Sequence, residues 1–196
     1  MITAQILLIV LSLQVVGIKM TFFTAIIAGL TVAAGLALSG TLQNFTSGIL
    51  ILLLKPYRVG DNIVTQGQTG TVTSIQLFST IVVTFDNTTV IVPNSKLSNE
   101  IIINLTKSGK RRLDIELKFP HSADIEKLKM IIHDAVNSFD NTLKDNPARV
   151  GVSAIEKDGF TVHINTWLPS HQFEDNRLGI NERLLKELRK AALLNA

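Results

Sequence analysis

The chain has 196 residues, of which 46% are hydrophobic, and it carries a formal net charge of +3. The small net charge does not support a nucleic-acid-binding function, and the absence of cysteine excludes a disulfide framework and a cysteine nucleophile. Lys19 is the only ionisable side chain before Lys55. The sequence therefore divides into an apolar N-terminal part, which predicts membrane helices, and a charged part, which is long enough for one or two small soluble domains.

The first apolar run, within residues 1–17, predicts a partial or abbreviated transmembrane helix. From Met1 to Val16 a helix would be about 24 Å long, which is short for the roughly 30 Å hydrocarbon core of a bilayer. Such a helix either tilts in a thinned bilayer or is the end of a longer helix. A cleaved signal peptide is disfavoured because no basic segment precedes the run.

The second apolar run, within residues 18–56, contains no charged residue from Met20 to Leu54. As one helix it would be about 52 Å long, too long to cross a bilayer as a straight rod. Gly40 offers a break, because the part from Met20 to Gly40 would be about 31 Å long and would form one span. Thr41–Leu54 mixes polar and apolar residues like a helix at the membrane interface. We therefore expect a pore-lining helix kinked near Gly40, with an interfacial second half.

Small residues form two stripes along the first half of this helix. The first stripe, which covers about 80° at 100° per residue, contains Gly29, Ala33, Ala37 and Gly40. The second stripe, on another flank, contains Ala28, Thr31, Gly35 and Ser39. Val32 and Leu36 form an apolar ridge between the stripes, whereas Phe23, Ile27, Leu30 and Leu38 point the other way. Small residues allow helices to approach closely, so two stripes favour a ring of identical helices with the ridge facing its axis; a single helix pair is the alternative.

Residues 57–106 predict an all-β domain. Short β-branched runs are separated by turn residues, and Gly67, Gly70 and the pair Asp86–Asn87 predict hairpin turns. The expected strands are Asp61–Thr65, Thr69–Ile75, Thr80–Phe85, Thr89–Val92 and Ile101–Leu105. Such short strands in close succession are typical of a small barrel of the Sm or OB type. The aromatic residues are too few and scattered for a base-stacking platform, which favours a structural barrel over an RNA-binding one.

Residues 107–196 predict an α+β domain of the ferredoxin-like kind. The run Lys107–Arg112 is interpreted as a basic linker, and contact with an anion or a phospholipid headgroup is the less favoured alternative. Periodicity then predicts a strand, a helix, two strands and a helix. Their ranges are Leu113–Phe119, Asp124–Phe139, Arg149–Glu156, Thr161–Leu168 and Asn176–Leu194. This βαββα order suits a two-layer domain.

The sequence carries no pattern typical of an enzyme or a metal site. Its histidines lie in different predicted elements, without the close spacing of metal ligands, and Gly67–Gly70 does not match a phosphate-binding loop. We therefore expect no catalytic activity, no cofactor and no metal. Lys55 and Arg58 directly follow the long apolar run, so the positive-inside rule places the soluble part in the cytoplasm.

Three motifs resemble the small-conductance mechanosensitive channel family, the MscS-like channels. In chain order they are AGLTVAAGLALSGTLQNFTSGILILLLKPYRVGD, GTVTSIQLFST and VIVPNSKLSNEIIIN, and the resemblance extends from about Ala28 to Leu194. It implies a homo-heptamer in the cytoplasmic (inner) membrane, multi-pass, with a kinked pore helix from each subunit. Below the pore it implies an Sm-like ring and a cytoplasmic cage of α+β domains with side portals. Membrane tension opens such a pore, which is weakly selective and releases ions and small solutes on hypo-osmotic shock.

The resemblance also implies roles for individual residues. The two pore-constricting positions of the family fall on Val32 and Leu36, the kink glycine on Gly40, the amide of the interfacial helix on Asn44 and a second flexible glycine on Gly48. Leucine is usual at both constrictions and glutamine is usual before the kink glycine, so Val32 and Ser39 depart from the family pattern. Family members also have outer helices before the segment that begins at Met1 and a short strand after the last helix. The implied partners are further copies of the chain, membrane lipids, and permeating ions and small solutes, with no nucleic acid.

Two other functions stay open as alternatives: a non-conducting, membrane-anchored oligomeric scaffold and an Sm-like RNA-binding module. A secondary transporter is disfavoured because the long apolar run contains no ionisable residue that could couple an ion to a substrate.

Overall fold

The computed structural model describes residues 2–17 and 20–193. The described residues do not include Met1, residues 18 and 19, or residues 194–196. The expected domain limits at residues 1, 18 and 196 and the expected helix end at Leu194 therefore lie outside them. The chain folds into two compact units. One unit consists of the N-terminal helices up to Lys55 with Ser74–Val82 and Thr89–Glu100, and the other consists of Pro56–Thr73, Val83–Thr88 and the chain from Ile101 onward.

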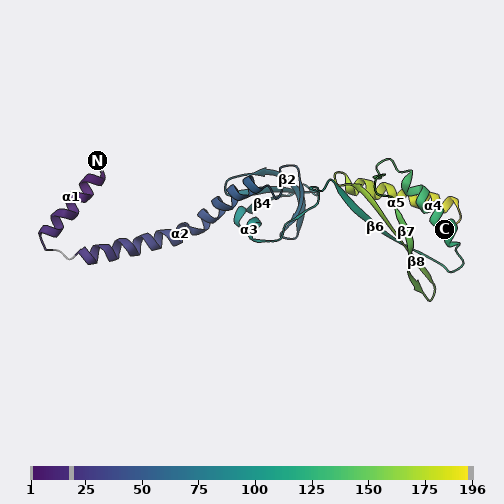
Figure 1. Ribbon diagram of the computed structural model, residues 1–196, viewed down its shortest axis with the longest axis horizontal. Helices are drawn as coiled ribbons and strands as arrows, with labels where there is room; N and C mark the ends of the chain where they lie inside the picture. The colour runs from purple at the N-terminus through teal and green to yellow at the C-terminus, as the bar shows by residue number, and fades with distance from the viewer. Residues whose placement is uncertain (1, 18–19, 194–196) are drawn as a thin grey trace. The chain divides into compact units, whose positions relative to one another are not determined.

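The N-terminal part forms two helices, and the first of them is followed by a turn at Val16 and Gly17. Helix α1 comprises Ile2–Val15, and helix α2 comprises Met20–Leu54. Within the described residues, α2 is the one helix that is long and apolar enough to cross a membrane. Helical structure continues without interruption through Gly40 for all 35 residues of α2, and Figure 1 shows a single helix whose axis is not straight. Gly40 therefore does not end the helix, and the location of a kink at this residue stays a prediction.

A five-stranded sheet follows α2, in the order β4-β3-β2-β1-β5. Its strands are β1 (Asn62–Thr65), β2 (Gln68–Ile75), β3 (Ser79–Thr84), β4 (Thr89–Pro93) and β5 (Ile103–Asn104). Alternate residues point inward, and Ile63, Val72, Val82 and Val92 are buried. All five predicted strands are present, with ends shifted by a few residues.

Two details of the β-domain differ from the sequence prediction. Gly70 does not lie in a turn: it pairs with Ile63 inside β2, and a Cβ atom there would lie 2.5 Å from the carbonyl oxygen of Val83. The glycine is required by close approach of two backbones rather than by a turn. Between β4 and β5 the chain forms a short helix, α3 (Asn94–Asn99), which the sequence analysis did not predict.

The C-terminal part contains β6 (Lys110–Phe119), α4 (Ile125–Asn137), β7 (Arg149–Glu156), β8 (Gly159–Pro169) and α5 (Phe173–Lys190). The sheet order is β6-β8-β7, and β8 is antiparallel to both neighbours. Strands β6 and β7 are therefore parallel with β8 inserted between them, which is the split βαβ arrangement expected of a ferredoxin-like domain.

Part of the expected basic linker belongs to the first strand of this domain. Lys110, Arg111 and Arg112 lie in β6 and pair in register with β8. The ammonium group of Lys110 lies 5.4 Å from the centre of the Trp167 ring, and the guanidinium of Arg111 lies 3.8 Å from the centre of the Phe173 ring. Backbone pairing with β8 places these residues in the strand, and the aromatic rings attract the two cations there.

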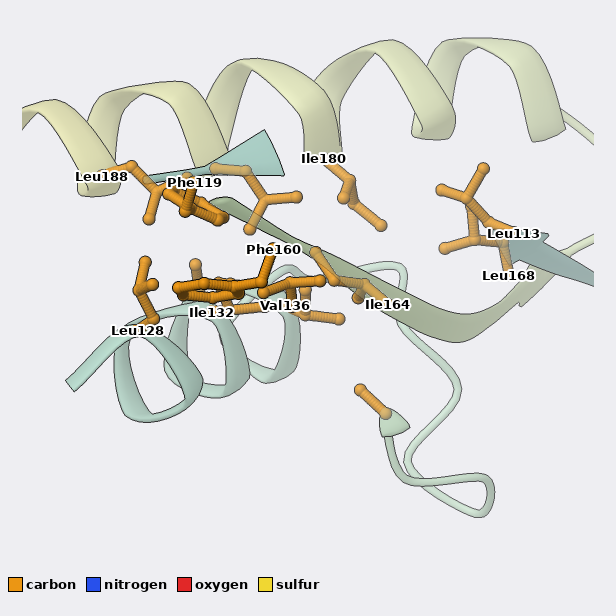
Figure 2. Close-up of a cluster of buried hydrophobic side chains, with 14 of the residues drawn as sticks. Leu113, Phe119, Leu128, Ile132, Val136, Phe160, Ile164, Leu168, Ile180 and Leu188 are labelled. Atoms are coloured by element: carbon orange, nitrogen blue, oxygen red, sulfur yellow. The ribbon is translucent and has the colours of Figure 1, made fainter. Parts of the chain in front are cut away.

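The core of the α+β domain lies between one face of its sheet and the two helices. In Figure 2, Leu128, Ile132 and Val136 of α4 and Ile180 and Leu188 of α5 point toward Phe160 and Ile164 of β8. Ile132 and Ile164 are fully buried. This face is apolar because alternate residues of β6 and β8 point toward the helices. The expected fold class, apolar helices followed by an all-β domain and an α+β domain, is confirmed.

Candidate functional site: the apolar helix and its junction with the β-domain

The predicted constriction residues lie on the surface of α2 within this chain. The side chains of Val32 and Leu36 are 62% and 71% exposed. Large apolar side chains at these exposures are unfavourable in water, so they require either lipid or another protein surface.

The glycines beside this ridge pack against no other part of the chain that the structure describes. A Cβ atom added at Gly29, Gly35 or Gly40 would meet no atom within 4 Å. Ala33 and Ala37, of the same predicted stripes, are exposed as well. Because glycine lowers helix stability by about 1 kcal/mol relative to alanine, its presence at open positions indicates a partner outside this chain.

Hydroxyl groups on the second stripe are satisfied within the helix. Thr31 Oγ1 donates to the carbonyl oxygen of Ile27 at 2.8 Å, and Ser39 Oγ donates to that of Leu36 at 2.8 Å. Such bonds to the preceding turn remove the cost of placing a hydroxyl in an apolar environment. The stripe can therefore lie against lipid or another helix without an additional polar partner.

Asn44 joins α2 to the β-domain. Its amide nitrogen donates to the carbonyl oxygen of Gly40 at 3.1 Å, and its amide oxygen accepts the backbone N–H of Ser95 at 2.9 Å. The first turn of α3 has no side-chain cap from its own preceding residue, Pro93. Asn44 supplies that cap from a distant part of the sequence, and it links Gly40 to α3 through one side chain.

Gly48 lies where α2 packs on the β-domain. A Cβ atom at this position would clash with the carbonyl oxygen of Leu77 and would lie 2.6 Å from Asn94 Nδ2. Ser47 and Ile51 on the same face are buried, and the rings of Phe45 and Phe78 lie 6.2 Å apart. The flexibility that the resemblance implies for Gly48 stays a prediction, and the structure gives this glycine a close-packing role.

Asn94 organises the surface that receives α2, and the sequence analysis did not identify it. It is fully buried, its amide oxygen accepts from Thr80 Oγ1 at 2.9 Å, and its amide nitrogen donates to the carbonyl oxygens of Gln76 and Leu77 at 2.9 and 3.1 Å. A sequence signal existed, since asparagine directly after Pro93 at the end of a strand is typical of a turn or helix start.

The histidines do not come together in the described part of the chain. Those residues contain no group of three or more His, Asp or Glu side chains arranged to hold a metal ion. His163 lies between Asp114 and Glu116 on the exposed face of the α+β sheet, with ring nitrogens 3.8 and 3.9 Å from the two carboxylates.

Comparison with known proteins identifies the β-domain first. Residues 40–107 match the family described as mechanosensitive ion channel, beta-domain. This range includes Gly40, Asn44, Gly48 and Asn94, so the junction described above lies within a domain type of mechanosensitive channels.

Relatives extend the match beyond this domain. A small-conductance mechanosensitive channel of Edwardsiella ictaluri is 36% identical over 135 residues, which cover 69% of this chain and 47% of the relative. The small-conductance mechanosensitive channel MscMJ of Methanocaldococcus jannaschii is 38% identical over 126 residues, which cover 61% of this chain and 36% of that protein. The chain belongs to the MscS-like family of small-conductance mechanosensitive channels.

Solved structures agree on the fold. The closed-state crystal structure of Helicobacter pylori MscS matches with a TM-score of 0.82 and 24% identity, over 96% of this chain and 76% of that chain. Arabidopsis thaliana MSL1 matches with a TM-score of 0.72 and 20% identity, over 94% and 70% of the two chains. The chain spans about half the length of the curated relatives that it matches.

Proposed function

We propose that this chain forms the pore and the cytoplasmic part of a mechanosensitive channel opened by membrane tension. The observation that carries the proposal is the apolar ridge of Val32 and Leu36, exposed on a helix that continues directly into a β-domain of the mechanosensitive channel type. Family membership and two flanking stripes of small residues support a ring of identical helices around that ridge.

The proposed architecture assigns a role to each part of the chain. Residues 1–17 belong to a membrane helix, 18–56 to the pore helix, 57–106 to an Sm-like β-domain and 107–196 to a cytoplasmic cage domain. The assembly is a homo-oligomer, a heptamer as in the family pattern, in the inner membrane with several membrane passes and its C-terminal part in the cytoplasm. Its pore releases ions and small solutes with weak selectivity during hypo-osmotic shock, and the protein is not an enzyme.

Closure follows from the chemistry of the ridge. A ring of valine and leucine side chains offers no hydrogen-bonding group to water, so confined water is unfavourable there even where some physical opening remains. The pore then closes by dewetting, and widening under tension lets water and ions enter.

The test is recording from liposome patches under graded suction. The parent chain is expected to open with tension, and Leu36→Ser is expected to open at lower tension or to leak, because each subunit gains a hydroxyl at the constriction. Val32→Ser should act in the same direction but more weakly, since valine loses less apolar surface.

Leu38→Ser is the matched control, because Leu38 is 63% exposed but lies on the other side of the helix. This variant should keep the parent threshold. A parent chain that assembles but never conducts would support the scaffold alternative, and specific RNA binding by such a chain would support the RNA-binding alternative. Opening of Leu36→Ser at higher tension than the parent would rule out the dewetting gate.

A further inference from the structure

The segment that directly follows α2 is held in place by a half-buried carboxylate, that of Asp61. Asp61 Oδ2 accepts the backbone N–H of Arg58 at 2.9 Å and the amide nitrogen of Asn104 at 2.8 Å. Asp61 Oδ1 accepts the hydroxyl of Thr106 at 3.2 Å. We refer to Asp61, Asn104 and Thr106 as the Asp61 latch.

The electrostatics of Asp61 favour its charged form. Burial raises the pKa of this carboxyl, but the hydrogen bonds from Asn104, the Arg58 backbone and Thr106, with the nearby Arg58 charge, outweigh burial and lower the pKa below its usual value. Hydrogen bonds to an ionised acceptor are roughly twice as strong as neutral ones. The latch is therefore a set of charge-assisted bonds rather than a chance surface contact.

Asn104 and Lys107 bind the segment after α2 at a second point, the carbonyl oxygen of Pro56. The amide nitrogen of Asn104 also lies 3.3 Å from the carbonyl oxygen of Pro56, to which Lys107 Nζ donates at 3.4 Å. The amide oxygen of Asn104 accepts the backbone N–H groups of Thr106 and Lys107 at 3.0 and 2.9 Å. One asparagine thus orders the chain after β5 and binds it to the segment after α2.

The hydrogen bonds continue into the C-terminal domain. Ser170, which is 2% exposed and follows β8, donates its hydroxyl to the carbonyl oxygen of Thr106 at 3.2 Å. The backbone N–H of Ser170 donates to the carbonyl oxygen of Gly109 at 3.0 Å. All of these residues belong to the second compact unit. A connected series of bonds therefore leads from Pro56, through Asp61 and Thr106, to the end of β8.

We propose that Asp61 is a positioning residue that fastens the exit of the pore helix to the chain entering the cage domain and thereby restrains opening. The part of this inference that concerns opening rests on the proposed channel function. A pull on α2 reaches Pro56–Asp61 through the covalent chain, and displacement of that segment requires the bonds of the latch to break. Weakening the latch then removes a restraint, and the pore opens at lower tension.

The test compares Asp61→Asn with the matched control Asp158→Asn in the full chain. Asparagine keeps the shape of aspartate and can keep one oxygen for the donors of Arg58 and Asn104, but it removes the negative charge, so these bonds lose their charge assistance and about half their strength. Asp158 is an exposed aspartate in the turn between β7 and β8, so the control makes the same charge change away from the latch. Thr106→Val removes the donor to Asp61 and also the acceptor of the Asn62 backbone N–H, and it is expected to act in the same direction.

Two measurements decide the proposal. Amide hydrogen exchange at Arg58 is expected to be about tenfold faster in Asp61→Asn than in the parent and unchanged in Asp158→Asn, with protection of β8 retained as evidence of folding. The opening tension in liposome patches is expected to shift to lower values in Asp61→Asn only.

Unchanged exchange at Arg58 would overturn the latch itself. Faster exchange with an unchanged opening tension would overturn the restraint. If the parent does not open under tension at all, both the proposed channel function and the proposed effect of Asp61 on opening are wrong. The exchange data still decide whether Asp61 holds the segment after α2 in place.

Discussion

The amide oxygen of Asn44 in α2 caps the backbone N–H of Ser95 in α3 at 2.9 Å, although 51 positions separate the two residues. A side chain of the apolar helix thus completes the first turn of a helix in the β-domain. The same side chain donates to the carbonyl oxygen of Gly40, at the predicted kink. Asn44 therefore connects the predicted bending point of α2 to the fold of the β-domain.

Asn44→Ala is expected to destabilise this junction by about 1 kcal/mol, the usual effect of removing a helix cap. Asn44→Asp keeps an oxygen acceptor for Ser95 but loses the donor to Gly40, so it should retain most of the cap. Hydrogen exchange at Ser95 measures the cap directly, and it should rise in the alanine variant and change little in the aspartate variant. Gln43→Ala, at the exposed neighbouring position, serves as the control; equal exchange at Ser95 in all variants would contradict the capping role.

Gly48→Ala and Gly35→Ala are expected to fail in different ways. At Gly48 the new methyl group clashes with Leu77 and Asn94 of the same chain, and overpacking of this kind costs about 1 to 3 kcal/mol. At Gly35 the methyl group would meet nothing within 4 Å among the described residues, so a loss of assembly there would point to contacts between subunits of the proposed ring.

Thermal unfolding and subunit mass in detergent separate the two effects. Gly48→Ala should unfold at lower temperature. Gly35→Ala, or the bulkier Ala33→Val on the other stripe, should impair assembly or raise the opening tension. Normal assembly and normal gating of both stripe variants would argue against packing of helices along the stripes.

The short helix α3 explains one limit of prediction from sequence. Its six residues, NSKLSN, contain a single large apolar side chain, Leu97, which is 2% exposed. No periodicity can be recognised in so short a polar segment. Its stability comes from tertiary contacts instead: the burial of Leu97, the hydrogen bonds of Asn94 and the cap from Asn44. The strands, by contrast, could be predicted because their β-branched residues alternate between a buried and an exposed face.

Gly48 shows why the candidate site could be predicted only in part. The resemblance to a family pointed to Asn44 and Gly48, but a glycine in a helix has the same sequence signature whether it bends or packs closely. What distinguishes the two at Gly48 is the Leu77 carbonyl, which is distant in sequence. Likewise, the ridge of Val32 and Leu36 follows from helical angles, but within the described residues of one chain it stays exposed, so its pore-lining role remains a prediction.

Thr166→Val is expected to stabilise the α+β domain by about 1 kcal/mol. The hydroxyl of Thr166 is fully buried, and among the described residues it has no hydrogen-bond partner. A buried hydroxyl without a partner is destabilising, and valine has nearly the same shape and suits a strand. Thr142→Val is the contrasting variant, because Thr142 Oγ1 donates to the carbonyl oxygen of Val136 at 2.9 Å. The unfolding temperature in detergent should be higher than that of the parent for Thr166→Val and lower for Thr142→Val. A lower unfolding temperature in both variants would imply that the Thr166 hydroxyl has a hydrogen-bond partner.

The Asp61 latch predicts an acid-sensitive contribution to stability. The pKa of Asp61 in the folded chain lies below the ordinary value of 3.8, so the folded state binds its proton less tightly than the unfolded state. The resulting stabilisation is fully present above the ordinary value and is lost as pH falls through the lowered folded pKa. Asp61→Asn should therefore unfold at lower temperature than the parent at pH 7, and the gap between the two should narrow below about pH 4. Unfolding temperatures measured from pH 7 to pH 3 test this, with Asp158→Asn as the reference for a simple change of charge. A difference in unfolding temperature between the parent and Asp61→Asn that stays constant from pH 7 to pH 3 would show that the ionised carboxylate of Asp61 does not accept the hydrogen bonds of the latch.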